Sequence, residues 1–67
     1  MTDTVTDIAA FELPYRRKAM LRRVDFDSGL SMVRLVLREG TRITQVDLDV
    51  DSATVLGEAL VAAAKDV

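Results

Sequence analysis

The segment from Asp51 to about Lys65 constrains this chain more than any other feature, because it has the pattern of a helix that is apolar around nearly its whole circumference. Asp51 and Ser52 are short polar residues of the kind that cap the free N–H groups of a first helical turn. One apolar stripe at helical spacing is expected to pack on a sheet, and further apolar residues lie outside it at Val55, Ala59, Val61 and Ala62. A helix of this kind is buried on more than one side, and a monomer of 67 residues has nothing to cover the second side. The sequence therefore predicts a homodimer.

Cysteine and histidine are both absent from the chain. A chain this short buries only about 60% of the surface that its unfolded form exposes, so its core alone leaves it marginally stable. Without cysteine no disulfide stabilises it, and without either residue type it lacks the usual zinc ligands and the commonest general base. No histidine is present to activate a serine, and the three glycines are isolated rather than grouped in a phosphate-binding loop. We predict no enzymatic activity, no cofactor and no metal site, and we expect self-association to supply the missing stability.

One acidic pattern has the spacing of a calcium-binding loop. Asp47, Asp49 and Asp51 alternate, and Glu58 stands at the twelfth position, where such a loop places a bidentate carboxylate. The sixth position, however, is Ser52 rather than the glycine that the sharp turn of the loop requires. The alternation is also that of a β-strand. We interpret the segment as the end of a strand followed by a helix cap, and not as a calcium site.

Four segments have the composition of β-strands bounded by turn residues. These segments are residues 8–13, 18–26, 30–38 and 41–50. Pro14 ends the first and favours a sheet edge, and Asp27-Ser28-Gly29 and Glu39-Gly40 supply the turns between the later strands. The predicted fold is α+β: an antiparallel meander of three to four strands with one C-terminal helix packed on it, in the order β-β-β-(β)-α. Residues 1–7 are expected to be a flexible end, and residues 8–67 a single domain.

The Glu39-Gly40 pair sets the expected pairing of the last two strands if the loop between them is tight. Val33 then lies opposite Val46 on one face of the sheet, and Val36 lies opposite Ile43 on the other. A bulged loop changes this register and is left open, because Glu39 fits a positive φ poorly. Both faces carry apolar residues, so neither is plainly a solvent side, and the dimer interface is expected to use the sheet and the helix. Its candidate residues are Leu30, Met32, Val36, Ile43, Val55, Ala59 and Ala62.

Gly57 interrupts the predicted helix at a cost of about 1 kcal/mol relative to alanine. A glycine at such a position permits another backbone to approach the helix closely. That backbone belongs either to a partner or to the chain's own sheet, and we favour its own sheet.

Basic residues are concentrated in the middle of an acidic chain. The isoelectric point is about 4.8, yet residues 13–42 carry eight bases against three acids. Single-stranded nucleic acid binds to positively charged surfaces that also carry aromatic side chains. The candidate residues for such a surface are Tyr15, Arg16, Arg17, Lys18, Arg22, Arg23 and Arg34. The alternative is that long basic side chains cover the edges of the sheet and pair with nearby acids, and the acidic total and scarce aromatics favour it.

The layout of residues 8–66 resembles that of a known family. The basic residues Arg16, Arg17, Lys18, Arg22 and Arg23 in an early strand and the terminal helix Asp51 to Lys65 carry the resemblance. In this layout the chain is similar to the positive-cofactor transcriptional coactivators, which are small homodimers that bind single-stranded DNA. The resemblance implies a sheet-plus-helix homodimer with a nucleic-acid-binding sheet. The segment from Val46 to Leu60, VDLDVDSATVLGEAL, is also similar to the strand-to-helix junction of several small uncharacterised bacterial proteins.

The remaining composition bears on location and function. No run of the chain has the length and apolarity of a transmembrane helix, and Asp3, Asp7 and Glu12 stand where a signal peptide is basic and then apolar. We therefore expect a cytoplasmic protein with no membrane partner. The leading functional prediction is a small homodimeric interaction or assembly module, whose ligand is another protein or its own copy. The alternative is a single-stranded nucleic-acid binder that uses the basic strand face.

Overall fold

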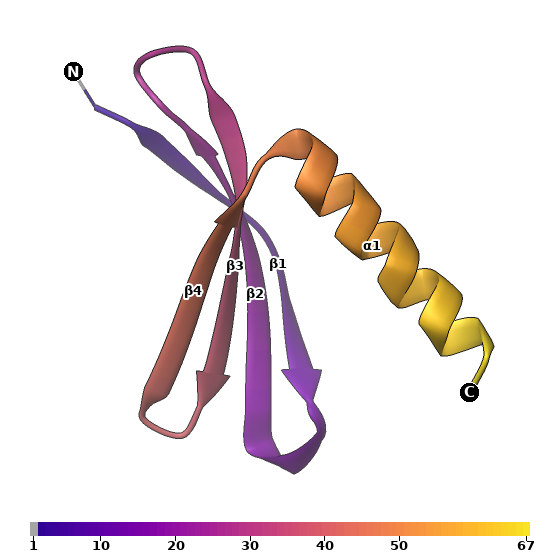
Figure 1. Cartoon of the computed structure of the whole chain (residues 1–67). Helices are drawn as coiled ribbons and strands as arrows, with labels where there is room; N and C mark the ends of the chain where they lie inside the picture. Colours follow the sequence, from indigo (N-terminus) through magenta and orange to yellow (C-terminus); the bar gives the residue numbers. More distant parts are fainter. Residues whose placement is uncertain (1) are drawn as a thin grey trace.

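The computed structural model describes residues 2–67, which form a meander of strands followed by one helix (Figure 1). The elements are β1 (Thr4–Leu13), the 3-10 helix η1 (Pro14–Arg16), β2 (Arg17–Asp25), β3 (Ser31–Glu39), β4 (Arg42–Leu48) and α1 (Val50–Lys65). The four strands form one antiparallel sheet in the order β1-β2-β3-β4. The predicted α+β class and strand-to-helix order are confirmed, and the first segment forms a true fourth strand.

β1 is longer than the sequence indicates. The sequence predicts a strand from Ile8 with a flexible end before it, whereas the strand begins at Thr4 and its first residues pair with the end of β2. A register shift between Asp7 and Ala9 marks a β-bulge. Asp3 adds a further tie, because its side chain accepts a hydrogen bond from the backbone N–H of Asp27 at 2.9 Å. The expectation for Met1 lies outside the described residues.

The β3–β4 hairpin has a different register from the predicted one. Val33 pairs with Leu48 rather than Val46, and Val36 pairs with Gln45 rather than Ile43. The reason lies in the turn, where Gly40 has a φ of +61° and Glu39 stays in the strand, paired with Arg42. Glycine at the first central position of a two-residue hairpin loop adopts this conformation without strain. The partners move by two residues, so each side chain keeps its predicted face.

The registers fix which residues share a face of the sheet, because side chains alternate between the two faces. The face toward α1, which we name the helix-side face, is mostly apolar and includes Phe11, Ala19, Leu21, Val33, Leu35, Leu37, Val46 and Leu48. The opposite face, which we name the far face, mixes apolar and charged residues: Asp7, Met20, Arg22, Val24, Met32, Arg34, Val36, Arg38, Ile43 and Asp47. Among residues 2–67 the buried hydrophobic side chains are Ala19, Val24 and Val36. The core therefore lies in β2 and β3, which have neighbours on both sides.

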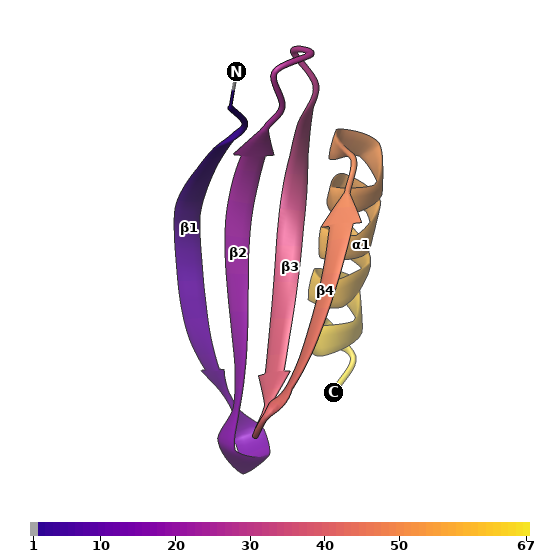
Figure 2. The same cartoon turned by 90° about the vertical axis from the view of Figure 1, so that its left-hand side faces the viewer.

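α1 follows β4 after one residue, Asp49, and runs back along the sheet while diverging from it (Figures 1 and 2). Its contacts with the sheet are mainly to β3 and β4. The beginning of the helix and the end of β4 form a shallow groove lined chiefly by Leu48, Val55, Leu56 and Ala59. The helix is thus attached along one side of the helix-side face and leaves much of that face uncovered. Among the described residues, no helix has the length and apolarity needed to cross a membrane.

The molecule is more open than a compact chain of its size. Its radius of gyration is 13.5 Å and its thinnest extent is 16 Å, whereas a compact chain of this length has a radius of gyration of about 11 Å. The accessible surface is 5514 Å², and a folded monomer of this mass exposes about 4,200 Å². Much surface that a single domain normally buries is therefore exposed to solvent.

Candidate interaction surface

α1 has hydrogen-bonded caps at both of its ends. Asp49 caps the helix, and its Oδ1 accepts a hydrogen bond from the backbone N–H of Ser52 at 2.7 Å. The Thr54 hydroxyl donates to the Val50 carbonyl at 2.8 Å, and at the other end the Asp66 N–H donates to the Ala63 carbonyl at 3.2 Å. The cap predicted at Asp51 or Ser52 is therefore wrong, because the helix begins earlier and both residues lie inside its first turn. Hydrogen bonds from Ser52, by its side chain and then by its backbone N–H, lower the pKa of Asp49.

The same helix buries none of its side chains in the chain. Val55 is 67% exposed and Leu60 is 63% exposed, and Leu56 and Val61 are also among the exposed large hydrophobic residues. Val55 and Leu56 line the groove on the side of α1 that faces the sheet, whereas Val61 lies on the side that carries Thr54, seven residues earlier. A Cβ built on Gly57 meets nothing within 4 Å, so our interpretation of Gly57 as a close approach to the chain's own sheet is wrong. The helix therefore presents an apolar surface without a partner among the described residues.

The helix-side face supplies the second apolar surface. Val46, in the middle of this face, is 46% exposed, and Phe11 on β1 is also exposed. Leu35 and Leu37 are half-buried by their strand neighbours but have no covering layer above them. These residues are not among the predicted interface residues, although the alternation along residues 33, 35 and 37 indicates a shared face. α1 and the helix-side face thus form two apolar surfaces that diverge from each other along the length of the helix (Figure 1).

The predicted interface residues are divided between two surfaces. Val55 and Ala59 line the groove beside β4, on the side of α1 that faces the sheet, and Ala62 is exposed on the same helix. Leu30 and Ile43 are exposed, but Ile43 lies on the far face and Leu30 precedes β3. Met32 is partly buried on the far face, and Val36 is already 4% exposed within one chain. The structure therefore does not bring these residues together as one patch.

A row of charges crosses the middle of the far face. Arg22 and Arg34 are direct neighbours on β2 and β3, an arrangement that is repulsive without compensation. Asp7 on β1 pairs with Arg22 at 3.0 Å, and Asp47 on β4 pairs with Arg34 through two contacts of 2.8 and 3.1 Å. The Arg34 guanidinium lowers the pKa of the Asp47 carboxyl, and Asp47 in turn raises the pKa of Arg34. Arg22 and Arg34, two arginines of the predicted nucleic-acid surface, are thus each paired with a carboxylate.

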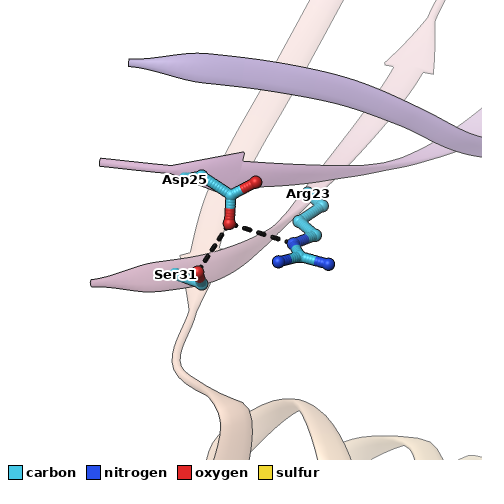
Figure 3. Close-up of polar contacts among 3 residues, drawn as sticks. All are labelled: Arg23, Asp25 and Ser31. Atoms are coloured by element: carbon cyan, nitrogen blue, oxygen red, sulfur yellow. Dashed lines mark hydrogen bonds and ion pairs between the residues drawn. The ribbon is translucent and has the colours of Figure 1, made fainter. Parts of the chain in front are cut away.

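A third paired arginine lies beside the β2–β3 turn. Asp25 accepts hydrogen bonds from the Ser31 hydroxyl at 2.6 Å and from Nε of Arg23 at 3.0 Å (Figure 3). Ser31 and Asp25 are direct cross-strand partners, so the contact closes the hairpin. These hydrogen bonds, from Ser31 first and Arg23 second, lower the pKa of Asp25.

The remaining bases gather at the opposite end of the sheet, which we name the basic end. It consists of Tyr15, Arg16, Arg17, Lys18, Arg38 and Arg42, brought together by the β1–β2 and β3–β4 connections. Arg17 pairs with Glu39 and Lys18 with Glu12, whereas Arg16, Arg38 and Arg42 form no ion pair within residues 2–67. Tyr15 is 86% exposed, with the Arg17 guanidinium 5.8 Å from its ring centroid.

The connection at the basic end is conformationally unusual. Tyr15 and Arg16 have φ values of +64° and +61°, a region that side chains other than glycine rarely occupy. Such conformations cost free energy and are common in binding segments. The turn therefore holds an exposed aromatic ring and a cation outward at the tip of the sheet.

The acidic pattern with calcium-loop spacing is used within the fold. Asp47 pairs with Arg34 on β3, and Asp49 caps α1. In the part of the chain that the structure describes, no three acidic side chains are grouped as metal ligands.

The comparisons with known proteins give a family and no function. No curated protein and no solved structure gives a significant match to this chain. The resemblance to the positive-cofactor coactivators therefore stays a prediction. A family model does match nearly the whole chain, from residue 2 to residue 66, which spans all four strands and the helix. The chain belongs to the family of unknown function DUF6967.

Proposed function

We propose that this chain works as a homodimeric assembly module, joined through the apolar surfaces of α1 and the helix-side face. The observation that carries the proposal is that α1 has no buried side chain, although most of its circumference is apolar. A capped helix of 16 residues is only marginally stable in water by itself. Packing of its apolar sides against a second chain supplies the missing stabilisation.

The exposed area supports the same conclusion. The accessible surface of 5514 Å² exceeds the value expected for a compact monomer by roughly 1,300 Å². An interface of ordinary size buries about 800 Å² on each partner. The surplus is therefore large enough to accommodate a stable dimer and to leave a polar rim.

Sedimentation equilibrium tests the proposal. We expect the wild-type chain to be a dimer, with an unfolding midpoint that rises with protein concentration. Val55→Glu places a charge on the exposed apolar side of α1 and is expected to give a folded monomer. Thr54→Glu introduces the same group on the polar side of the same helical turn and is expected to remain dimeric. A wild-type chain that stays monomeric at its highest soluble concentration contradicts the proposal, as does a dimeric Val55→Glu variant.

A second candidate function is binding of single-stranded nucleic acid at the basic end. The observation that favours it is the grouping of Arg16, Arg38 and Arg42, which have no carboxylate partner among residues 2–67, beside exposed Tyr15. Cations that track phosphates, together with an aromatic ring on which a base stacks, are the components of such a surface. In this candidate function the nucleic acid contacts the tip of the sheet rather than its face.

Fluorescence anisotropy of a labelled single-stranded oligonucleotide tests this candidate at about 50 and 200 mM salt, because phosphate contacts are lost steeply between them. We expect Arg38→Gln to weaken binding and to reduce the salt slope by roughly 1. Arg34→Gln, on the same face of β3 but paired with Asp47, is the matched control and should change binding little. Absence of binding at the lower salt concentration contradicts this function.

A further inference from the structure

We propose that the dimer is formed by reciprocal docking, in which α1 of each copy lies across the helix-side face of the other. This inference rests on the proposed homodimer and names the two surfaces that meet in it. Each copy then contributes one helix and receives one, so a two-fold axis relates the two contacts. α1 would pack against its own β4 on one side and against the partner's sheet on another, which accounts for its apolar circumference.

The geometry of the β4–α1 connection argues against closure of the helix on its own sheet. A single residue, Asp49, joins the two elements, and its side chain and carbonyl are both used in the first turn, by Ser52 N–H at 2.7 Å and Ala53 N–H at 2.9 Å. These bonds begin the first helical turn directly after β4, with no loop between the two elements. The helix diverges from the sheet along its length (Figure 1), and its contacts with the sheet are mainly to β3 and β4. The open space faces Leu35, Leu37 and Phe11, on the uncovered part of the helix-side face.

The sizes of the two surfaces match. A helix of 16 residues is about 24 Å long, and a nine-residue strand such as β3 spans about 30 Å. One helix therefore lies within the length of the central strands. Apolar residues on the helix-side face reach all four strands, so a docked helix meets an apolar surface throughout.

The far face is a weaker candidate for this contact. Its middle carries the row Asp7, Arg22, Arg34 and Asp47. Covering these four charged groups with an apolar helix removes their contact with water, a cost that the ion pairs already formed do not offset. The helix-side face has charged residues only toward its two ends, at Arg23 and Asp25 and at Arg17, Glu39 and Arg42, which suits the polar rim of an interface.

Cysteine cross-linking tests the docking directly, because the natural chain contains no cysteine. Ala59→Cys marks α1, and Val46→Cys marks the centre of the helix-side face; Gln45→Cys, the preceding residue, marks the far face and is the matched control. Two chains with different tags, one carrying Ala59→Cys, are refolded together and treated with a short bismaleimide cross-linker. We expect several-fold more mixed product with Val46→Cys than with Gln45→Cys. Circular dichroism of each variant establishes that it is folded.

The other outcomes separate this inference from the proposed function. A dimer by sedimentation that gives only product between two Ala59→Cys chains overturns reciprocal docking and keeps the homodimer. Equal yields with Val46→Cys and Gln45→Cys also overturn it. A wild-type chain that stays monomeric in sedimentation equilibrium overturns the docking and the homodimer together.

Discussion

The central hairpin and the C-terminal helix reach stability by different routes. β2 and β3 have strand neighbours on both sides and hold Ala19, Val24 and Val36, the buried hydrophobic residues of the described chain. α1 has hydrogen-bonded caps at both ends but buries no side chain. Hydrogen bonding is local and is completed by a few neighbouring residues, whereas burial needs a second surface. The hairpin therefore forms its core within one chain, and we propose that a second copy covers the helix.

The largest expected difference between the two regions comes from removing methyl groups. Val24 is 2% exposed, and Val24→Ala should lower the free energy of unfolding by about 2 kcal/mol through lost burial and a cavity. Val55→Ala makes the same change on the apolar side of α1, where the side chain is 67% exposed, and should have little effect on the monomer. Urea unfolding at several protein concentrations measures both variants.

The dependence of the two unfolding free energies on protein concentration shows whether a partner covers α1. A Val55→Ala effect that is negligible in dilute solution and grows with protein concentration shows that the partner covers α1. A Val24→Ala effect below that of Val55→Ala in dilute solution contradicts the assignment of the core to the central hairpin.

The sequence predicted the elements well and their relationships less well. Alternation and turn residues located the later strands, because these signals are local. The register of β3 and β4 was wrong because Glu39 was placed in the turn. Two cues in the sequence favour the observed register: it puts only Gly40 at positive φ, and it sets Arg34 opposite Asp47.

The candidate interfaces were harder to predict. The pairing of Arg22 with Asp7 depends on a bulge between Asp7 and Ala9, which no local residue pattern indicates. The apolar circumference of α1 did indicate a helix that one chain leaves uncovered. The cap was predicted at Asp51 or Ser52, whereas α1 begins after Asp49. The expected packing of the helix on its own sheet followed from one apolar stripe, and the structure limits that contact mainly to β3 and β4.

A smaller effect is expected from filling Gly57. A methyl group at this position meets nothing within 4 Å in the single chain, so Gly57→Ala should stabilise α1 by about 1 kcal/mol. Ala62→Gly, the reverse change in the same helix, should destabilise it by a similar amount. Thermal unfolding of dilute protein measures the gain, and sedimentation of the same variant measures the dimer. A gain in dilute solution together with weaker dimerisation places Gly57 at the contact with the partner; no gain in dilute solution contradicts an uncovered helix.

The smallest expected effect is the loss of stability in acid. It has one contribution from two carboxylates of the sheet and another from the carboxylate that caps the helix. Hydrogen bonds from Ser31 and Arg34 lower the pKa values of Asp25 and Asp47, and those from Ser52 lower that of Asp49, below the ordinary value of 3.8. The unfolded chain therefore binds protons before the folded chain does as the pH falls. The stability that these groups contribute is fully present above the ordinary value and is lost below it, as the pH passes through the lowered pKa values.

Substitution by asparagine assigns that loss to one region or the other. Asparagine caps a helix as well as aspartate does but does not titrate, so Asp49→Asn should keep the helix at neutral pH and reduce its loss in acid. Asp47→Asn removes the ion pair with Arg34 and should lower stability at neutral pH. Circular dichroism of the helix and the unfolding midpoint, followed from about pH 5 to about pH 2, measure the two responses. An Asp49→Asn chain whose helix signal falls with acid as steeply as the wild type shows that α1 is lost with the sheet rather than through its own cap, because the two regions then unfold as one unit.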